Sequence, residues 1–449
     1  MLYALGVIVF AVGLLGSIAL HEVGHMVPAK KFGVKVTQYM VGFGPTVWSK
    51  RKGETEYGIK AIPLGGYIRM IGMIPPRQNN KPSRWPRRLA TTVEDFRSAS
   101  RHDVQPGDDH REFYRLTPWK KIVVMCGGPV MNFVIYVVLT ILLLGTIGMK
   151  NPTNKVDSVA QCVVAANTSV PADGSCPAGA PTAPANGALK PGDEILAVNG
   201  TKMKSWDDTV AIIEKSAGKN LQLTIRRDGV EQTVNIMPVE NRKYVNDTSD
   251  KTKVAGFIGV GTTYAYQRVG VVQIPGQINA QIVQGLRALG SFPQKIGSLF
   301  GTVFEGKKRD PNGAVGVVGL GRIGGEVASS HGLDFLDKAY FLLFLLAGVN
   351  LLLFFFNLVP LLPLDGGHVA GAVLESIKRR VVARREMTAG RAERAPPDGE
   401  GRHAVRVRKQ IYVDTAQMVP VLYGVAGLLL MFTLLVVYAD IVKPITLNS

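Results

Sequence analysis

The stretch LYALGVIVFAVGLLGSIALHEVGH, residues 2–25, begins as an uncharged apolar run and ends with His21, Glu22 and His25. About 20 apolar residues are enough to cross a bilayer as a helix, so residues 2–20 predict a membrane span. Ionisable side chains in such a segment are energetically costly and therefore indicate a functional site. A lone histidine there would indicate packing or proton transfer, but three ionisable groups at this spacing favour metal chemistry.

Three later runs are similarly apolar and of similar length, at residues 122–149, 340–362 and 419–438. The chain of 449 residues is therefore predicted to be a polytopic α-helical membrane protein with about four transmembrane helices. The first run is longer than the roughly 7–15-residue core of a secretory signal, and its polar cluster lies at its end. We therefore expect it to be retained as a helix.

The net charge of +18 is concentrated in two segments between the apolar runs. Residues 28–121 hold 19 Lys and Arg against 8 Asp and Glu, and residues 366–417 hold 11 against 6. Such an excess is typical of cytoplasmic loops, whereas residues 150–338 are closer to balance. We expect a multi-pass protein of the cell membrane with its N-terminus and residues 150–338 outside. The basic loops suit the lipid bilayer, and nucleic-acid binding is not expected.

Residues 30–76 combine β-branched and aromatic runs with glycines, a pattern that predicts strands and hairpins. The segment is unusually apolar for a cytosolic loop, and non-helical backbone is tolerated at membrane depth where it lines a protein cavity. We expect a re-entrant, β-rich element whose strand edges can receive an extended peptide. A small cytosolic β-domain is the alternative. The polar residues 77–118 after it predict a mobile cytoplasmic linker.

In the predicted outside segment, GALKPGDEILAVNG (residues 187–200) predicts a turn, a strand and a second turn. A helix is expected over about residues 205–215, followed by a hairpin around Asp228 and Gly229. This order resembles a PDZ domain, in the circularly permuted form found in bacterial proteases, over roughly residues 156–240. A PDZ groove adds a peptide as an extra strand. A purely structural β-sandwich-like insert is the alternative.

Cys162 and Cys176 both fall in this outside segment, where an oxidising compartment permits a disulfide. We expect the pair to be bridged, with two free thiols as the alternative. A bridge would limit the freedom of this loop in the unfolded chain.

Two weaker patterns precede the third apolar run. Apolar residues at helical spacing in residues 277–304 predict an amphipathic helix against the membrane surface. The stretch VGVVGLGRIGG, residues 315–325, contains a GxGxxG spacing, but a dinucleotide site would need a βαβ unit and an acidic residue about 20 positions later. The chain instead leads into a membrane helix, so no nucleotide site is expected.

His21, Glu22 and His25 form the pattern His-Glu-x-x-His. Positions i and i+4 of a helix share a face, so both imidazoles can bind one zinc ion. Glu22 lies beside them and can take a proton from water activated by the metal. A catalytic zinc needs a third protein ligand, which a distant segment must supply.

NLVPLLPLDGGH, residues 357–368, contains the candidate third ligand. Asp365 ends the third apolar run, and Pro360 and Pro363 interrupt helical hydrogen bonding so that the carboxylate can point back into the helix bundle. His368 competes for the role. An ordinary turn residue is the alternative for Asp365, because Asp-Gly-Gly is common in turns. We favour Asp365 because it sits at the turn itself.

Four features together resemble the site-2 proteases, which are intramembrane zinc metalloproteases: HEVGH in the first span, GPVMN (residues 128–132) in the second, the PDZ-like insert, and NLVPLLPLDGGH in the third. VGFGPTVWS and YGIKAIPLGGY are also similar to that family's re-entrant β element. The permuted PDZ pattern and the cysteine pair are similar to its actinobacterial branch. One mild departure is Pro363, which follows Pro360 by three positions where relatives often have two.

The resemblance implies that His21, His25 and Asp365 bind Zn²⁺ and that Glu22 is the catalytic acid and base. It implies a zinc metalloendopeptidase that cuts within the transmembrane segments of single-pass membrane proteins. Anti-sigma factors and similar regulators, already trimmed by another protease, are the family's usual substrates, and this succession of cuts is regulated intramembrane proteolysis. A non-catalytic PDZ membrane scaffold is the alternative.

The resemblance also implies that the side-chain amides of Asn357 and Asn132 bind the substrate. For Asn132, a helix–helix hydrogen bond is an equally good interpretation. A helical substrate hides its carbonyl groups in hydrogen bonds, so it must unwind, and a strand edge beside the site could pair with the exposed backbone.

The predicted segments follow one another along the chain in nine parts. They are a first membrane helix with the zinc motif (1–29), the β-rich element (30–76), the cytoplasmic linker (77–118), a second membrane helix (119–149), the PDZ domain (150–240), a segment joining it to the third membrane helix (241–338), that helix (339–364), a cytoplasmic-side loop with the metal ligand (365–416) and a fourth membrane helix (417–440).

Overall fold

The computed structural model describes residues 1–77, 85–165, 175–244, 252–307, 309–310, 313–392 and 412–445. The chain divides into two compact units. We call Met1–Leu143 together with Val271–Ser449 the membrane unit, and Leu144–Gly270 the inserted unit.

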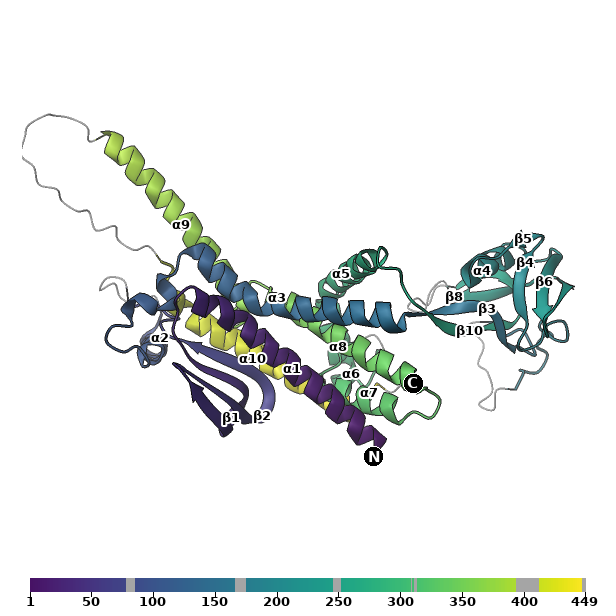
Figure 1. Cartoon of the computed structure of the whole chain (residues 1–449), viewed down its shortest axis with the longest axis horizontal. Coiled ribbons are helices and arrows are strands. Elements are labelled where there is room, and N and C mark those ends of the chain that lie inside the picture. Colours follow the sequence, from purple (N-terminus) through teal and green to yellow (C-terminus); the bar gives the residue numbers. More distant parts are fainter. Residues whose placement is uncertain are drawn as a thin grey trace, which may run out of the picture. The chain divides into compact units, whose positions relative to one another are not determined.

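Within the described residues, four helices are long and apolar enough to cross a bilayer, as the sequence predicts. They are α1 (Leu2–Lys31), α3 (Pro118–Leu142, continued by a π-helical turn, Leu143–Ile147), α8 (Phe335–Asn357) and α10 (Val419–Val442, preceded by the 3-10 turn η4, Thr415–Met418). Helices α1 and α3 lie side by side (Figure 1) and are so close that only glycine fits: a Cβ on Gly24 would lie 2.2 Å from the Gly127 carbonyl oxygen. Small residues allow such backbone contact between membrane helices.

Two long strands, β1 (Val36–Lys52) and β2 (Thr55–Met70), form the predicted β-rich element. The register shows how they are arranged: Met40 of β1 pairs with both Gly58 and Tyr67 of β2. The first half of β1 therefore lies between the two halves of β2.

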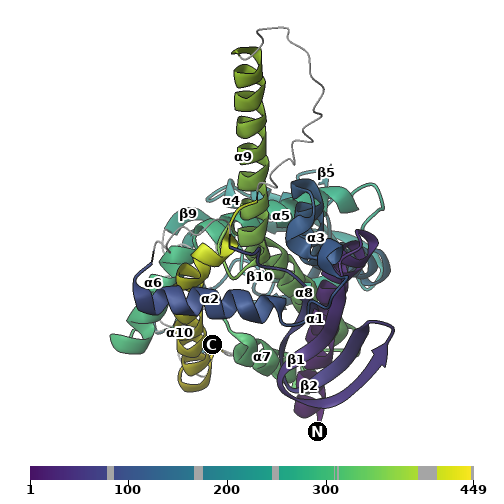
Figure 2. The same ribbon diagram turned by 90° about the vertical axis from the view of Figure 1, so that its left-hand side faces the viewer.

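The last part of β2, residues 66–70, consequently has a strand partner on one side only in the described chain. We call this segment the β2 edge. The sheet lies beside α1 (Figure 2), where the Tyr39 hydroxyl donates a hydrogen bond to the Ala19 carbonyl oxygen at 2.7 Å. This bond helps to hold the sheet against the helix that carries the histidine motif.

Helix α2 (Arg87–Arg101) lies in the segment predicted to be a linker, so that prediction is wrong for these residues. Val93 and Arg97 are buried, and the Arg97 guanidinium pairs with the Asp414 carboxylate at 3.1 Å, close to the start of α10. The helix is amphipathic although its sequence is strongly charged, because a few apolar residues recur three and four positions apart. Two 3-10 turns, η1 (Asp109–Arg111) and η2 (Phe113–Arg115), lead from α2 to α3.

Helix α9 (Asp365–Ala392) occupies the first part of residues 365–416, the segment predicted to be a cytoplasmic-side loop between two membrane helices. An aspartate followed by glycines here opens a helix, where a carboxylate is favourable. The preceding helix α8 ends at Asn357, earlier than expected, because two prolines follow. The turn between the helices is tight: a Cβ on Gly366 would lie 2.3 Å from the Val359 carbonyl oxygen.

Three shorter helices precede α8: α5 (Ile274–Gly290), α6 (Phe292–Phe304) and α7 (Val317–Ser329). The single helix expected over residues 277–304 is two helices, because Pro293 starts a new one. The glycines of the GxGxxG pattern lie within α7, which packs on α1. A Cβ on Gly6 would lie 2.5 Å from the Gly324 carbonyl oxygen, so the pattern serves helix packing.

The inserted unit contains, in its described residues, a six-stranded sheet in the order β10-β3-β4-β6-β7 with β5 beside β4. Its elements are β3 (Met149–Val159), β4 (Glu194–Val198), β5 (Thr201–Lys202), α4 (Trp206–Glu214), β6 (Leu221–Arg227), β7 (Val230–Ile236), the separate pair β8 (Val239–Tyr244) and β9 (Thr252–Phe257), and β10 (Val260–Gln267). The expected helix and the hairpin around Asp228 are confirmed. Ile195, Leu223 and Ile225 are buried in the core of the unit.

The inserted unit extends further than the predicted domain boundary at residue 240. Strand β10 pairs with β3, so the compact unit ends at Gly270. A disulfide joins Cys162 and Cys176, the pair expected from the sequence.

Candidate metal centre

One face of α1 presents His21 and His25, which lie one helical turn apart. Nδ1 of His25 donates a hydrogen bond to the Val124 carbonyl oxygen of α3 at 2.8 Å. This bond places the proton on Nδ1 and leaves Nε2 available as a ligand. The Nε2 atoms of the two histidines lie 3.2 Å apart, so both rings turn the same nitrogen towards one point.

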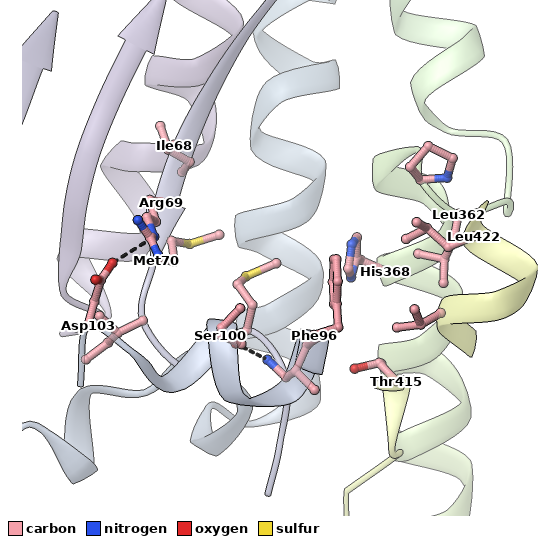
Figure 3. Close-up of a pocket in the computed structure, with 16 residues that line it drawn as sticks. Ile68, Arg69, Met70, Phe96, Ser100, Asp103, Leu362, His368, Thr415 and Leu422 are labelled. Atoms are coloured by element: carbon pink, nitrogen blue, oxygen red, sulfur yellow. Dashed lines mark hydrogen bonds and ion pairs between the residues drawn. The ribbon is translucent and has the colours of Figure 1, made fainter. Parts of the chain in front are cut away.

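Asp365 reaches this point from the first turn of α9. Its Oδ2 lies 3.4 Å from Nε2 of His21 and 3.4 Å from Nε2 of His25. The ligand atoms of His21, His25 and Asp365 all lie within 4.8 Å of one another, so the three side chains can share one metal ion. Among the described residues, no other group of three or more His, Cys, Asp or Glu side chains meets this condition. His368, the competing candidate, lies outside this group and lines a separate cavity (Figure 3).

The three side chains fit a zinc ion. His21 Nδ1 and Asp365 Oδ2 are buried without a hydrogen-bond partner among the described residues. Gly128 of α3 faces both rings, because a Cβ there would lie 2.2 Å from His25 Nε2 and 2.6 Å from His21 Nε2. Glycine therefore leaves space where the ligand atoms converge. Two imidazole nitrogens and a carboxylate oxygen are donors that catalytic zinc commonly takes.

Glu22 lies beside these ligands, in contact with the β2 edge. Its side chain is only 9% exposed. Its carboxylate lies near the backbone N–H of Ile68, and its Cγ would lie 3.0 Å from a Cβ on Gly66. The candidate acid–base residue and a strand edge with an unused side are therefore adjacent.

The two asparagines predicted to bind substrate occupy different positions. Asn132 lies one turn beyond Gly128 on α3, is 1% exposed, and neither atom of its amide has a hydrogen-bond partner in the described residues. The helix–helix hydrogen bond considered for Asn132 is thus not seen. Asn357 is the last residue of α8, half-buried, directly before the turn that leads to Asp365.

Two buried polar contacts near the site are not evident from the sequence patterns. Asn350 of α8 donates to the hydroxyl of Ser17, one turn before His21, at 2.9 Å. Lys121 of α3 pairs with Glu375 of α9 at 2.7 Å, and both are buried. An asparagine in an apolar run is a signal that could have identified Asn350. The Lys121 pair joins residues too distant in sequence to be matched without the fold.

A buried zinc donor set whose two histidines lie on a helix able to cross a bilayer, with a carboxylate beside it, defines a membrane metallopeptidase. The model of peptidase family M50 matches residues 9–392. The chain is 34% identical to the zinc metalloprotease Rip1 of Mycobacterium tuberculosis, over 100% of both chains. It is 26% identical to the zinc metalloprotease RasP of Bacillus licheniformis, over 81% of this chain and 88% of that protein.

The chain therefore belongs to peptidase family M50, the site-2 protease family, and is a multi-pass zinc metalloendopeptidase. The resemblance drawn from its motifs is confirmed, including the actinobacterial branch. A non-catalytic scaffold is not supported.

Proposed function

We propose that this enzyme cleaves peptide bonds within the transmembrane segments of single-pass membrane proteins of the anti-sigma-factor type, after another protease has trimmed them. The observation that carries the proposal is the meeting of His21, His25 and Asp365 among helices able to cross a membrane. A catalytic centre carried on such helices is suited to peptide bonds that lie in lipid.

His21 and His25 would hold the zinc ion through Nε2, and Asp365 through its carboxylate. When bound, zinc supplies a Lewis acid that polarises a carbonyl group and lowers the pKa of water. The Val124 carbonyl oxygen keeps His25 in the tautomer that this role requires. Gly128 keeps the space beside both rings open.

Glu22 would act first as a base and then as an acid. Its carboxylate takes a proton from the attacking water while the water oxygen bonds to the scissile carbonyl carbon. As the carbon–nitrogen bond breaks, the same carboxyl group returns that proton to the leaving amine. The backbone N–H of Ile68, which lies near the Glu22 carboxylate, would help to orient it for both transfers.

The β2 edge would hold the unwound substrate. A peptide carbonyl or N–H without a hydrogen bond costs several kcal/mol in a lipid environment, so an unwound segment needs partners. Residues 66–70 have no strand partner on one side in the described chain, so an extended chain can pair there by strand addition beside Glu22. The unpaired amide of Asn132 and that of Asn357 would supply further hydrogen bonds to the substrate.

In the proposed topology the N-terminus and the inserted unit are outside the cell. The inserted unit, which we take to be the PDZ domain, would exclude intact, bulky ectodomains. Replacing residues 149–267 with a short flexible linker should then permit cleavage of an untrimmed substrate. Unchanged dependence on prior trimming would remove this role.

The experiment compares membrane proteomes of cells that carry the intact protein or its Glu22→Gln variant. Glutamine keeps the shape of the side chain but cannot take the proton, so cleavage should fall by about 10²–10⁴-fold while zinc stays bound. Trimmed single-pass fragments should accumulate in cells with the variant. Full cleavage by the variant, with zinc content equal to that of the intact protein, would show that Glu22 is not the base.

A further inference from the structure

A cavity of about 390 Å³ lies in the membrane unit between β2, α2, the α8–α9 turn and the start of α10. Figure 3 shows Phe96 of α2 and His368 of α9 facing the same space as Leu362 and Leu422. The volume is in the range of pockets that bind small ligands, and it can take more than one side chain.

The lining of this cavity is chemically suited to apolar groups. Ile68, Met70 and Phe96 contribute apolar surface. The polar groups of the lining are partly used already: Arg69 pairs with Asp103 at 2.7 Å, as Figure 3 shows, and the Ser100 hydroxyl accepts a hydrogen bond from the backbone N–H of Ile74. The chemistry of the pocket therefore favours aliphatic or aromatic side chains.

The cavity adjoins the candidate metal centre, because its wall includes residues next to Glu22 and Asp365. Ile68 lines the cavity wall, its backbone N–H lies near Glu22, and a Cβ on the nearby Gly66 would lie 3.0 Å from the Glu22 Cγ. On the other side, Leu362 and Pro363 of the wall stand just before Asp365. A strand paired with residues 66–70 would therefore begin beside the reacting atoms and continue into the cavity. At roughly 3.3 Å per residue, those five positions span about 13 Å.

We propose that this cavity is a specificity pocket, which binds large apolar side chains within about four residues of the scissile bond, on its cytoplasmic side. This inference rests on the proposed function and on the topology proposed with it.

The inference gives α2 a role, because α2 forms one wall of the cavity and is fixed in place. Trp85 Nε1 donates to the Gln417 carbonyl oxygen at 2.9 Å, and Arg97 pairs with Asp414 at 3.1 Å.

The first test fills the pocket. Both Ala99 and its neighbour Ser98 on α2 are exposed, but only Ala99 lines the cavity. The full-length Ala99→Trp and Ser98→Trp variants are compared on two single-span reporters. One has leucine at the four positions on the cytoplasmic side of the cut mapped by mass spectrometry, and the other has alanine there.

Filling the pocket should affect only the bulky substrate. Ala99→Trp should lower kcat/KM for the leucine reporter by about tenfold or more and change it less than about twofold for the alanine reporter. Ser98→Trp should leave both unchanged. Equal losses on both reporters, or no loss on either, would overturn the inference.

The second test does not depend on turnover. In the inactive Glu22→Gln protein, a photoreactive benzophenone amino acid at position 99 should cross-link to the leucine reporter, and one at position 98 should not. No adduct from position 99, or equal adducts from both positions, would overturn the specificity pocket and leave the proposed function standing. Cleavage by Glu22→Gln at the normal rate would instead overturn the assigned base, whatever cross-links form.

Discussion

Two groups of buried ionisable side chains in the membrane unit differ in how their hydrogen bonds are satisfied. Both oxygens of Asp440 are used: one accepts from Arg309 at 2.6 Å, and the other accepts from two backbone N–H groups at the start of α7 at 2.9 Å. At the candidate metal centre, Asp365 Oδ2 is buried without a hydrogen-bond partner in the described residues and faces Nε2 of both histidines at 3.4 Å. Buried polar groups are normally paired, so a carboxylate with both oxygens hydrogen-bonded indicates support of the fold, and one with an unpaired buried oxygen indicates a ligand site.

The Lys121–Glu375 pair resembles Asp440, because both carboxylate oxygens of Glu375 have partners. Glu375 accepts from Lys121 at 2.7 Å and from Arg379 at 2.7 Å. The pair joins α3, which positions His25 through Val124, to α9, which begins with Asp365. It therefore connects the helices on which the candidate metal centre depends.

The largest effect on activity should come from changing a residue of the candidate metal centre. His25→Ala removes a candidate ligand, and outside the candidate metal centre it loses the hydrogen bond to the Val124 carbonyl oxygen, so zinc and cleavage should both be lost while the protein stays folded. Zinc per chain, measured by atomic emission, and thermal unfolding without added zinc check the two halves. A variant that kept its zinc would place the ion elsewhere.

Disrupting the Lys121–Glu375 pair should lower the stability of the protein rather than its zinc content. Glu375→Leu leaves Lys121 buried without this partner, which should cost about 3–5 kcal/mol of unfolding free energy, with zinc still bound in the folded fraction. Denaturant unfolding in detergent measures this loss. The double variant Lys121→Met/Glu375→Leu removes both charges and should recover most of it. A double variant as unstable as the single one would show that the pair is not the cause.

Gly128→Ala tests whether the open space beside the His21 and His25 rings is needed for zinc binding. Its Cβ would meet both imidazoles, so zinc affinity should fall by about 10–100-fold, a range typical of changes around a ligand shell. Competition with a fluorescent chelator measures the affinity. Gly16→Ala is the control, because a Cβ there meets nothing within 4 Å. Equal affinities in the two variants would contradict the assignment.

The smallest effect is expected in the inserted unit, where the Asp193–Arg227 ion pair is, like Asp440, fully paired. Hydrogen bonding from Arg227, at 2.7 Å, lowers the pKa of the buried Asp193 carboxyl below its ordinary value. Because the folded-state pKa is below the unfolded value of about 4, the stabilisation is present above that pH and is lost as the pH falls through the folded value. Hydrogen exchange of β4 and β6 amides should show this loss.

Asp193→Asn is the matched variant for this pH dependence. It should cost about 1.5 kcal/mol at neutral pH and flatten the acid-side dependence. An unchanged pH profile would mean that this ion pair does not couple to the stability of the unit.

The sequence predicts the parts of this molecule whose chemistry is local. His21 and His25 share a helix face because of their spacing, and the apolar runs predict the membrane helices by length alone. Asp365 could be proposed from its place after the prolines, but its approach to the histidines depends on the packing of α9 on α3.

The missed features depend on tertiary contacts or on a mixed pattern. Helix α2 has its few apolar residues in a charged stretch, and α9 opens with Asp-Gly-Gly, which is equally common in turns. The space left by Gly128 and the pairing of Lys121 with Glu375 appear only when α3 is placed against its neighbours.

The half-paired β2 edge has a consequence for which proteins are cut. An intact helix has no backbone groups to offer to residues 66–70, so recognition is limited by how readily a target segment melts. Two membrane proteins with the same residues at the cut would then be processed at different speeds if one carried glycine, proline or asparagine nearby. The stability of the target's transmembrane helix, as much as the residues around the cleaved bond, would determine how long the target persists in the cell.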